Sequence, residues 1–463
     1  MRSRTIVLAL SALVLGPALA PTSANAAWQT RTLGAGGEYS SVAVDSLGRL
    51  HISHLDGDSN PANYALRHAW YDGSVWRSQL IEDGDVGWWS SIAADSRDRL
   101  HVAYHGDRTG LRYALYDGAW TITLVAPGAG YANSIAVDAN DDPHIVTVSG
   151  NGELLYARRE GTEWRIETIP GGAIPFLRTS LVLDANGAAH VAFTRDASAR
   201  EVCYATNANG FWEVEHVANG EYSSMVLDPA GRPHVVLTTS VAGEPALWHA
   251  FRDGVSWLGE RIVEGVFDNP AAACGRDGSL HVAAGGYDFR QEFLAYGELD
   301  GAWTFARVRG GNVGFEMAIT LDRLGLPVIS CRAAGPHETS SLFFARQVKG
   351  EVGGVWESVS TSQAATKQVV KGKFRVENEG TAAARRLSVR FFLSDDDVFD
   401  TGDAPVGKRK QVPVLNPGQR KAVPLTYKAA TSVTGKFLIA LVEVSDRANE
   451  ADPSDNEVAA LIP

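Results

Sequence analysis

The sequence predicts an all-β protein in which a seven-bladed β-propeller is followed by a β-sandwich. Two observations lead to this prediction. One motif recurs seven times between Ser40 and Arg346, and after about Gly350 the repeat stops while alternating apolar strands continue. A repeat period in the forties, built from short strands, is typical of radially arranged sheets.

The repeated motif has its fullest copy at Ser41–Ser53, which reads SVAVDSLGRLHIS. An anchor position, usually Asp, recurs at spacings of 50, 43, 46, 44, 47 and 47 residues. The seven anchors are Asp45, Asp95, Asp138, Asp184, Asp228, Gly275 and Asp322.

Each copy predicts four strands in the same order. A short apolar strand ends at the anchor, and in the following turn Asp caps the backbone while a Gly such as Gly48 takes the left-handed position. Asp98 and Asp141 replace this Gly in two copies. The second strand starts at a recurrent His, and a hairpin turn such as Asp117-Gly118 separates the third strand from a fourth that starts at Trp.

The seventh copy lacks the hairpin and Trp after Phe343–Arg346. Trp28 lies 17 residues before Asp45, within the 16 to 20 residues that separate each such Trp from the next anchor. We therefore expect residues 27–33 to be the fourth strand of the last blade, which closes the ring and removes open sheet edges. A segment around Val352–Val359 is the alternative closing strand.

Residues 1–26 read as a secretory signal, with Arg2 and Arg4 before an apolar stretch and small residues at 24–26. No later stretch is long and apolar enough to span a membrane, so we expect a secreted protein, extracellular or at the cell surface. Without the signal, 40 basic residues face 54 acidic ones, a formal charge of −14. This charge argues against nucleic acid and anionic membranes as partners and leaves glycans and surface proteins.

The three cysteines are Cys203, Cys274 and Cys331. Because the number is odd, at least one lacks an intramolecular partner. All three fall in predicted blade strands, which favours small buried side chains. A Cys274–Cys331 disulfide between adjacent blades is the alternative.

The propeller is predicted to span residues 27–350, and the second domain residues 351–463 after a short glycine-rich linker at 350–354. The second domain resembles the CARDB family, an Ig-like module frequent in bacterial surface and secreted proteins. The resemblance implies an Ig-like β-sandwich with an adhesion or spacing role. It rests on Val376–Thr381, Phe392–Asp397, Asn416–Gly418 and Glu450–Glu457.

An acidic loop in this domain carries Asp395, Asp397, Asp400 and Asp403. Clustered carboxylates suit a hard cation, which makes them candidates for binding calcium. Asp400 stands where the EF-hand loop requires Gly, so a solvated hairpin loop is the preferred interpretation and no cofactor is expected.

Six histidines recur at the start of the second strands. They lie at equivalent positions in different blades and cannot converge on one metal ion, so we expect them to bind neighbouring backbone. The recurrent Trp residues are expected to pack between blades. The six histidines are His51, His101, His144, His190, His234 and His281.

Aromatic residues occur six to eight positions before every anchor, where the chain enters each blade at the mouth of the central channel. Sugars stack their C–H faces on aromatic rings and need polar groups at their rims, and Ser40, Ser90, Asn133 and Ser223 lie beside these rings. The residues therefore predict a ligand-binding site for glycan; the alternative is that they plug the channel. They are Tyr39, Trp88, Trp89, Tyr131, Phe176, Tyr222, Phe267 and Phe315.

Loops between the second and third strands are expected on the same face. His54 and His105, with Tyr104 and Arg108, are the candidates for an acid/base site on a charged polysaccharide. The repeat also resembles the BNR or Asp-box repeats of sialidases and some propeller polysaccharide lyases, which implies chemistry on glycans. It departs from that motif, because Asp45 and Gly48 are three residues apart instead of two.

The leading hypothesis is a secreted or cell-surface binding or adhesion protein without catalysis, with glycan as the favoured ligand. One alternative is a polysaccharide-degrading propeller enzyme, a lyase or a glycoside hydrolase. The other is a structural scaffold for protein–protein interaction.

Overall fold

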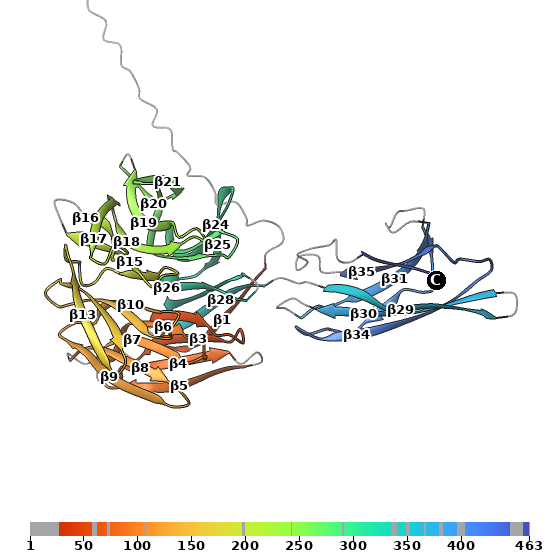
Figure 1. The fold of residues 1–463 in the computed structure, drawn as a ribbon, viewed down its shortest axis with the longest axis horizontal. Helices are drawn as coiled ribbons and strands as arrows, with labels where there is room; N and C mark the ends of the chain where they lie inside the picture. Colours follow the sequence, from red (N-terminus) through yellow and green to blue (C-terminus); the bar gives the residue numbers. More distant parts are fainter. Residues whose placement is uncertain are drawn as a thin grey trace, which may run out of the picture. The chain divides into compact units, whose positions relative to one another are not determined.

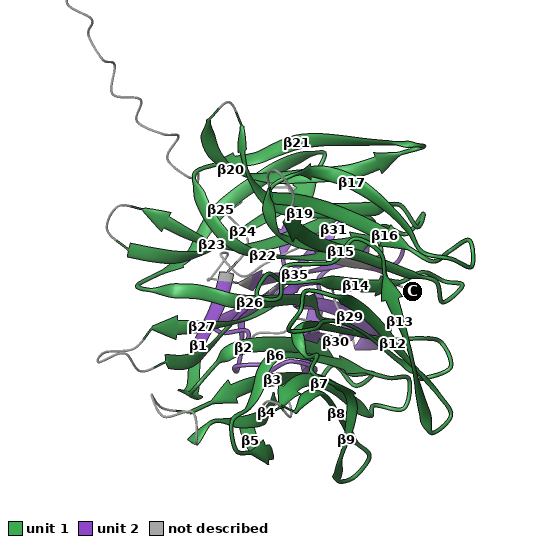
Figure 2. Cartoon of the chain, turned by 90° about the vertical axis from the view of Figure 1, so that its left-hand side faces the viewer, with its two compact units in different colours: residues 1–21, 32–325, 329–344 green, residues 22–31, 326–328, 345–463 purple. Residues whose placement is uncertain are grey.

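The computed structural model describes residues 27–57, 63–71, 75–106, 109–196, 200–241, 243–288, 291–323, 325–334, 340–348, 352–364, 367–378, 383–395, 403–444 and 457–462. The predicted signal at 1–26 lies outside them. The chain divides into two compact units (Figures 1 and 2). Unit 1 holds residues 32–325 and 329–344, and unit 2 holds residues 345–463 with short segments at 22–31 and 326–328.

The described part of residues 27–348 forms seven four-stranded sheets, numbered here as sheets 1 to 7. Sheets 1 to 6 are antiparallel meanders in chain order. Their strands are β2 (Glu38–Val44), β3 (Leu50–Asp56), β4 (Ala65–Tyr71) and β5 (Trp76–Asp83); β6 (Val86–Ala94), β7 (Leu100–Gly106), β8 (Gly110–Tyr116) and β9 (Trp120–Pro127); β10 (Tyr131–Val137), β11 (Pro143–Val148), β12 (Leu154–Glu160) and β13 (Glu163–Ile169); β14 (Ser180–Leu183), β15 (Ala189–Asp196), β16 (Arg200–Thr206) and β17 (Glu213–Asn219); β18 (Glu221–Leu227), β19 (Pro233–Val241), β20 (Glu244–Asp253) and β21 (Ser256–Glu264); β22 (Val266–Cys274), β23 (Leu280–Asp288), β24 (Gln291–Asp300) and β25 (Ala302–Gly310).

Sheet 7 joins both ends of the repeat region. Its order is β1-β28-β27-β26, so the N-terminal strand is its outer strand. These strands are β26 (Val313–Leu321), β27 (Pro327–Ala334), β28 (Ser340–Val348) and β1 (Ala27–Ala35). The sheets confirm the predicted all-β, propeller-like fold.

The first strands of the sheets contact one another in chain order: β2, β6, β10, β14, β18, β22 and β26. β26 in turn contacts β2. Figure 2 shows β2, β6, β14, β22 and β26 near the middle of unit 1, and β5, β9, β13 and β21 toward its rim. The first strands therefore surround a common centre.

Aromatic rings join neighbouring sheets farther from that centre. The Trp that opens a fourth strand packs edge-on against a third-strand ring of the preceding sheet, as Trp164 does on Tyr113, with ring centroids 5.1 Å apart. Trp76 of sheet 1 packs in the same way on Phe344 of sheet 7, at 4.8 Å. The predicted packing role of these Trp residues is confirmed.

The anchor turns form as predicted, but the recurrent histidines have different partners. The Asp45 carboxylate accepts the backbone N–H groups of Leu47 and Arg49. His51 Nε2 lies 3.1 Å from Asp45 Oδ2, and its Nδ1 lies 3.0 Å from His68 Nε2. The prediction of backbone partners was wrong, because a third-strand ring brings a polar atom to each imidazole; in most copies this ring is a Tyr, as at Tyr113, 2.7 Å from His101.

Asp98 and Asp141 adopt the left-handed conformation, with φ of 62° and 66°. Their carboxylates also bind the turn of the preceding sheet: Ser46 donates its N–H to Asp98 at 2.7 Å, and Ser96 donates its N–H to Asp141 at 3.0 Å. Asp therefore replaces Gly where the turn side chain links two sheets.

The described part of residues 352–462 in unit 2 is a β-sandwich. One sheet has the order β29-β30-β34, and the other has β32-β31-β35-β36, with β33 paired to β31. The strands are β29 (Val352–Ala364), β30 (Lys367–Asn378), β31 (Leu387–Ser394), β32 (Ala404–Pro405), β33 (Lys410–Val412), β34 (Arg420–Ala429), β35 (Phe437–Val444) and β36 (Glu457–Leu461). Its core includes Phe374, Leu387, Phe391 and Leu438.

The glycines of the predicted linker are partly structural. β29 already includes Gly354, and a Cβ at that position would come within 2.1 Å of the Phe374 ring. Gly354 therefore allows close packing of the first strand on the core.

Candidate functional site

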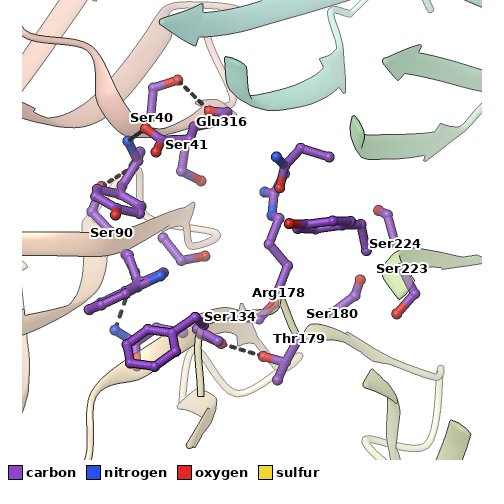
Figure 3. Close-up of a pocket in the computed structure, with 18 residues that line it drawn as sticks. Ser40, Ser41, Ser90, Ser134, Arg178, Thr179, Ser180, Ser223, Ser224 and Glu316 are labelled. Carbon is purple, nitrogen blue, oxygen red and sulfur yellow. Dashed lines mark hydrogen bonds between the residues drawn. The ribbon is translucent and has the colours of Figure 1, made fainter. Parts of the chain in front are cut away.

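A pocket of about 290 Å³ lies where the first strands of the seven sheets meet (Figure 3). Every repeat contributes to its lining the residue six positions before the anchor. These seven residues are Tyr39, Trp89, Ala132, Arg178, Tyr222, Asn269 and Glu316.

The backbone turns these side chains toward the pocket. Six of the seven residues, all except Arg178, have φ between 44° and 51°. The pairing of first and second strands shifts register at the same place, for example between Glu38 and Ser41 and between Glu221 and Ser224. A bulge re-aims a side chain, and left-handed conformations at non-glycine residues concentrate at functional sites.

Hydroxyl groups one and two positions after these residues link neighbouring sheets by hydrogen bonds. Ser41 Oγ accepts the N–H of Ile92 in the next sheet at 3.2 Å, and four further sheet pairs repeat this bond. One position earlier, Ser90 Oγ donates to the Tyr39 carbonyl of the preceding sheet at 2.8 Å, and Thr179 does the same to Ala132. Much of the pocket's hydroxyl capacity is therefore used within the protein.

One side of the pocket is an aromatic wall, defined here as Tyr39, Trp88, Trp89, Tyr131 and Phe176. Ring centroids lie 5.1 Å apart for Tyr39 and Trp89, and 5.0 Å apart for Trp89 and Tyr131. Phe176 contacts both Trp89 and Tyr131, yet 67% of its surface is exposed. An exposed ring held by its neighbours offers an apolar face to a ligand at little cost in side-chain entropy.

The other side is a polar wall, defined here as Arg178, Tyr222, Ser223, Asn269 and Glu316. Burial lowers the pKa of Arg178, which nonetheless stays charged, and Figure 3 shows its side chain extending into the pocket. Burial raises the pKa of Glu316, although Arg332 and the Tyr39 N–H stabilise the carboxylate. Burial likewise raises the pKa of the Tyr222 phenol.

The structure separates the predicted aromatic residues into two groups. Tyr39, Trp89, Phe176 and Tyr222 line the pocket, and Trp88 and Tyr131 stack on those that do.

Phe267 and Phe315 do not line the pocket. Phe267 packs on Phe293 and Phe305 within sheet 6, and Phe315 lies 4.4 Å from the Arg332 guanidinium. They stand eight and seven positions before their anchors, whereas the position that every repeat contributes to the pocket is the sixth. A strict count from each anchor would have identified Asn269 and Glu316 in their place, and would have found Arg178.

The candidate acid/base residues do not come together. Tyr104 is buried, and its hydroxyl donates to Glu82 at 2.5 Å. His54 is buried beside Leu55 O and lines a separate pocket between β1, β3 and β5. His105 alone borders the aromatic wall, 4.8 Å from the Tyr131 ring. Arg108 lies outside the described residues.

The calcium candidates are only partly described. Asp395 lies 2.6 Å from Lys436 Nζ, Asp403 is described, and Asp397 and Asp400 lie outside the described residues. Among the residues that the structure describes, no three His, Cys, Asp or Glu side chains gather as metal ligands would. The three cysteines are free thiols.

Residues 354–460 match the CARDB family model, so the sandwich is a CARDB domain as the sequence predicts. No curated protein sequence matches the chain. Within the described ranges, none of the elements is a helix with the length and apolar character that crossing a membrane requires.

Several solved structures are similar to the chain. Polysaccharide lyase Uly1 gives a TM-score of 0.44 at 10% identity, over 72% of this chain and 93% of that one. AofleA from Arthrobotrys oligospora gives 0.43 at 12% identity, over 62% and 90%. The SapL1 lectin in complex with alpha methyl fucoside gives 0.41 at 16% identity, over 59% and 97%.

Proposed function

We propose that this protein is a secreted, non-catalytic glycan-binding protein whose site is the pocket between the aromatic and polar walls. In this proposal the seven sheets are the blades of one closed propeller, a view supported by the contact of β26 with β2 and by the stacking of Trp76 on Phe344. The CARDB domain acts as a spacer or second contact at the cell surface.

The observation that carries the proposal is the exposed Phe176 ring, which continues the aromatic wall beside a pocket lined by hydroxyl groups. A sugar ring has an apolar face and a polar rim, so it complements one aromatic and one polar wall together. An apolar ligand would leave the Ser223 hydroxyl unpaired, which opposes its binding.

The experiment is a panel of immobilised glycans and polysaccharides, with and without calcium, in which released fragments are assayed in the same wells. We expect binding without release, weakened strongly by Trp89→Ala and less by Tyr222→Ala. Fragment release that is lost in His105→Ala would overturn the proposal in favour of a polysaccharide-degrading enzyme. The absence of both binding and release would contradict the proposal and favour a protein partner.

A further inference from the structure

Arg178 is a cation in the pocket without an acidic partner. It comes from sheet 4 and crosses to sheet 7, where its Nη1 donates to the carbonyl of Met317. Among the described residues, no carboxylate oxygen lies within 4.0 Å of its guanidinium, whereas most other arginines of unit 1 pair with an acid, as Arg99 does with Asp95 and Arg195 with Glu201. Removing an unpaired charge from bulk water is costly, so such a group indicates a missing anion.

Glu316, the acid of the pocket, is held by other groups. Its Oε2 accepts the Tyr39 N–H at 2.9 Å and lies 3.8 Å from Arg332 Nε. Its charge acts on Arg178 from beyond ion-pair distance. The remaining guanidinium N–H groups of Arg178 therefore have no charged acceptor among the described side chains.

A second polar group of the pocket also lacks a partner. Ser223 lines the pocket, is 1% exposed, and its Oγ has no hydrogen-bond partner among the described residues. The equivalent hydroxyls of Ser90 and Thr179 donate to the preceding sheet. A buried hydroxyl without a partner costs free energy unless a ligand satisfies it.

The geometry points to a carboxylate-bearing sugar as the ligand, with its carboxylate on Arg178, a neighbouring oxygen on Ser223 Oγ and its ring against the aromatic wall. Guanidinium binds carboxylate through two parallel N–H···O bonds, which a lysine cannot reproduce. This inference rests on the proposed glycan-binding function and specifies the class of sugar.

The test compares acidic oligosaccharides with their own neutral forms. Oligogalacturonate and oligomeric alginate, each beside its carboxyl-reduced counterpart, are titrated into the full chain by calorimetry. We expect at least one acidic form to bind about tenfold or more tightly than its reduced form. Equal binding of both forms would overturn the inference and leave the proposed function standing, whereas no binding of either form would contradict both.

Variants connect this preference to the pocket. Arg178→Gln should abolish the preference for the acid, and Arg178→Lys should keep only part of it. Because Arg178 also donates a hydrogen bond to the Met317 carbonyl, the stability of each variant is checked by thermal unfolding. Glu316→Gln provides an independent test of the charge preference. Removing the nearby negative charge should strengthen binding of the acid without strengthening binding of the reduced form; an unchanged ratio in both Arg178→Gln and Glu316→Gln would overturn the inference.

Competition separates a sugar from a simple carboxylate. Glutarate should not displace the acidic oligosaccharide at concentrations where free galacturonic acid does. Equal displacement by both would show that the pocket takes carboxylates of any kind and would overturn the assignment to a sugar.

Discussion

The two walls of the pocket come from the same segment of the repeats, five to eight positions before the anchors, but follow different physical rules. On the aromatic wall, rings contact one another in a connected group that includes Tyr39, Trp89 and Tyr131, so the wall is organised before a ligand arrives. On the polar wall, Arg178 has one carbonyl partner and Ser223 Oγ has none among the described residues. The difference teaches that the aromatic wall provides a preorganised apolar surface, whereas the polar wall provides hydrogen-bonding groups that the protein leaves without partners.

The largest effect is expected at the centre of the aromatic wall. Trp89→Ala removes the ring that touches Tyr39, Tyr131 and Phe176, and should weaken glycan binding by about 30-fold, or about 2 kcal/mol. Titration calorimetry measures this change. Trp89→Phe is the control and should keep most of the affinity; a loss as large as that of the alanine variant would contradict stacking.

At the edge of the same wall, Phe176→Ala should weaken binding by about tenfold and leave the melting temperature unchanged, because the ring is mostly exposed. Phe211, which is 61% exposed and does not line the pocket, offers a matched control. Phe211→Ala should change neither quantity. Equal effects of the two variants on affinity would contradict a specific role of the aromatic wall in binding the glycan.

Two serines at the same repeat position, five residues before the anchor, can be compared directly. Ser90→Ala removes the donor to Tyr39 O and should cost about 1 kcal/mol of stability with little direct loss of binding. Ser223→Ala removes a hydroxyl without a protein partner, so stability should stay the same while affinity for the glycan falls about fivefold. Chemical denaturation and calorimetry measure the pair, and the opposite pattern would show that Ser223 is structural.

The smallest effect concerns the pH dependence of the polar wall. Because burial raises the pKa of Glu316 above its unfolded value, its contribution to stability is complete below the unfolded pKa and is lost as pH rises through the folded pKa. Glu316→Gln should therefore raise the melting temperature by about 2 °C at pH 7 and by less at pH 4. Exposed Glu163→Gln should show no such difference, and a loss of stability at pH 7 in Glu316→Gln would contradict the direction.

The sequence by itself determined the repeat, the strands and the turns, because these depend on local patterns. Alternating apolar residues define the strands, and the Asp of each anchor caps its own turn within four residues, as Asp45 does for Arg49. The sequence also predicted the aromatic residues before the anchors, and a family resemblance in its motifs identified the CARDB domain. Even Asp98, which replaces the turn Gly, was predictable as a left-handed residue.

Only the tertiary structure decided which of these residues face one another. At the bulge before each anchor the side chain of the sixth position faces the pocket, so Asn269 lines the pocket and Phe267 does not. The partner of Arg178 is a carbonyl 139 residues away, and that of Tyr39 is a carboxylate 277 residues away. No local pattern encodes such pairs, because they depend on where the fold brings distant repeats together. The separation of an organised aromatic wall from an unsatisfied polar wall is therefore a property of the folded molecule.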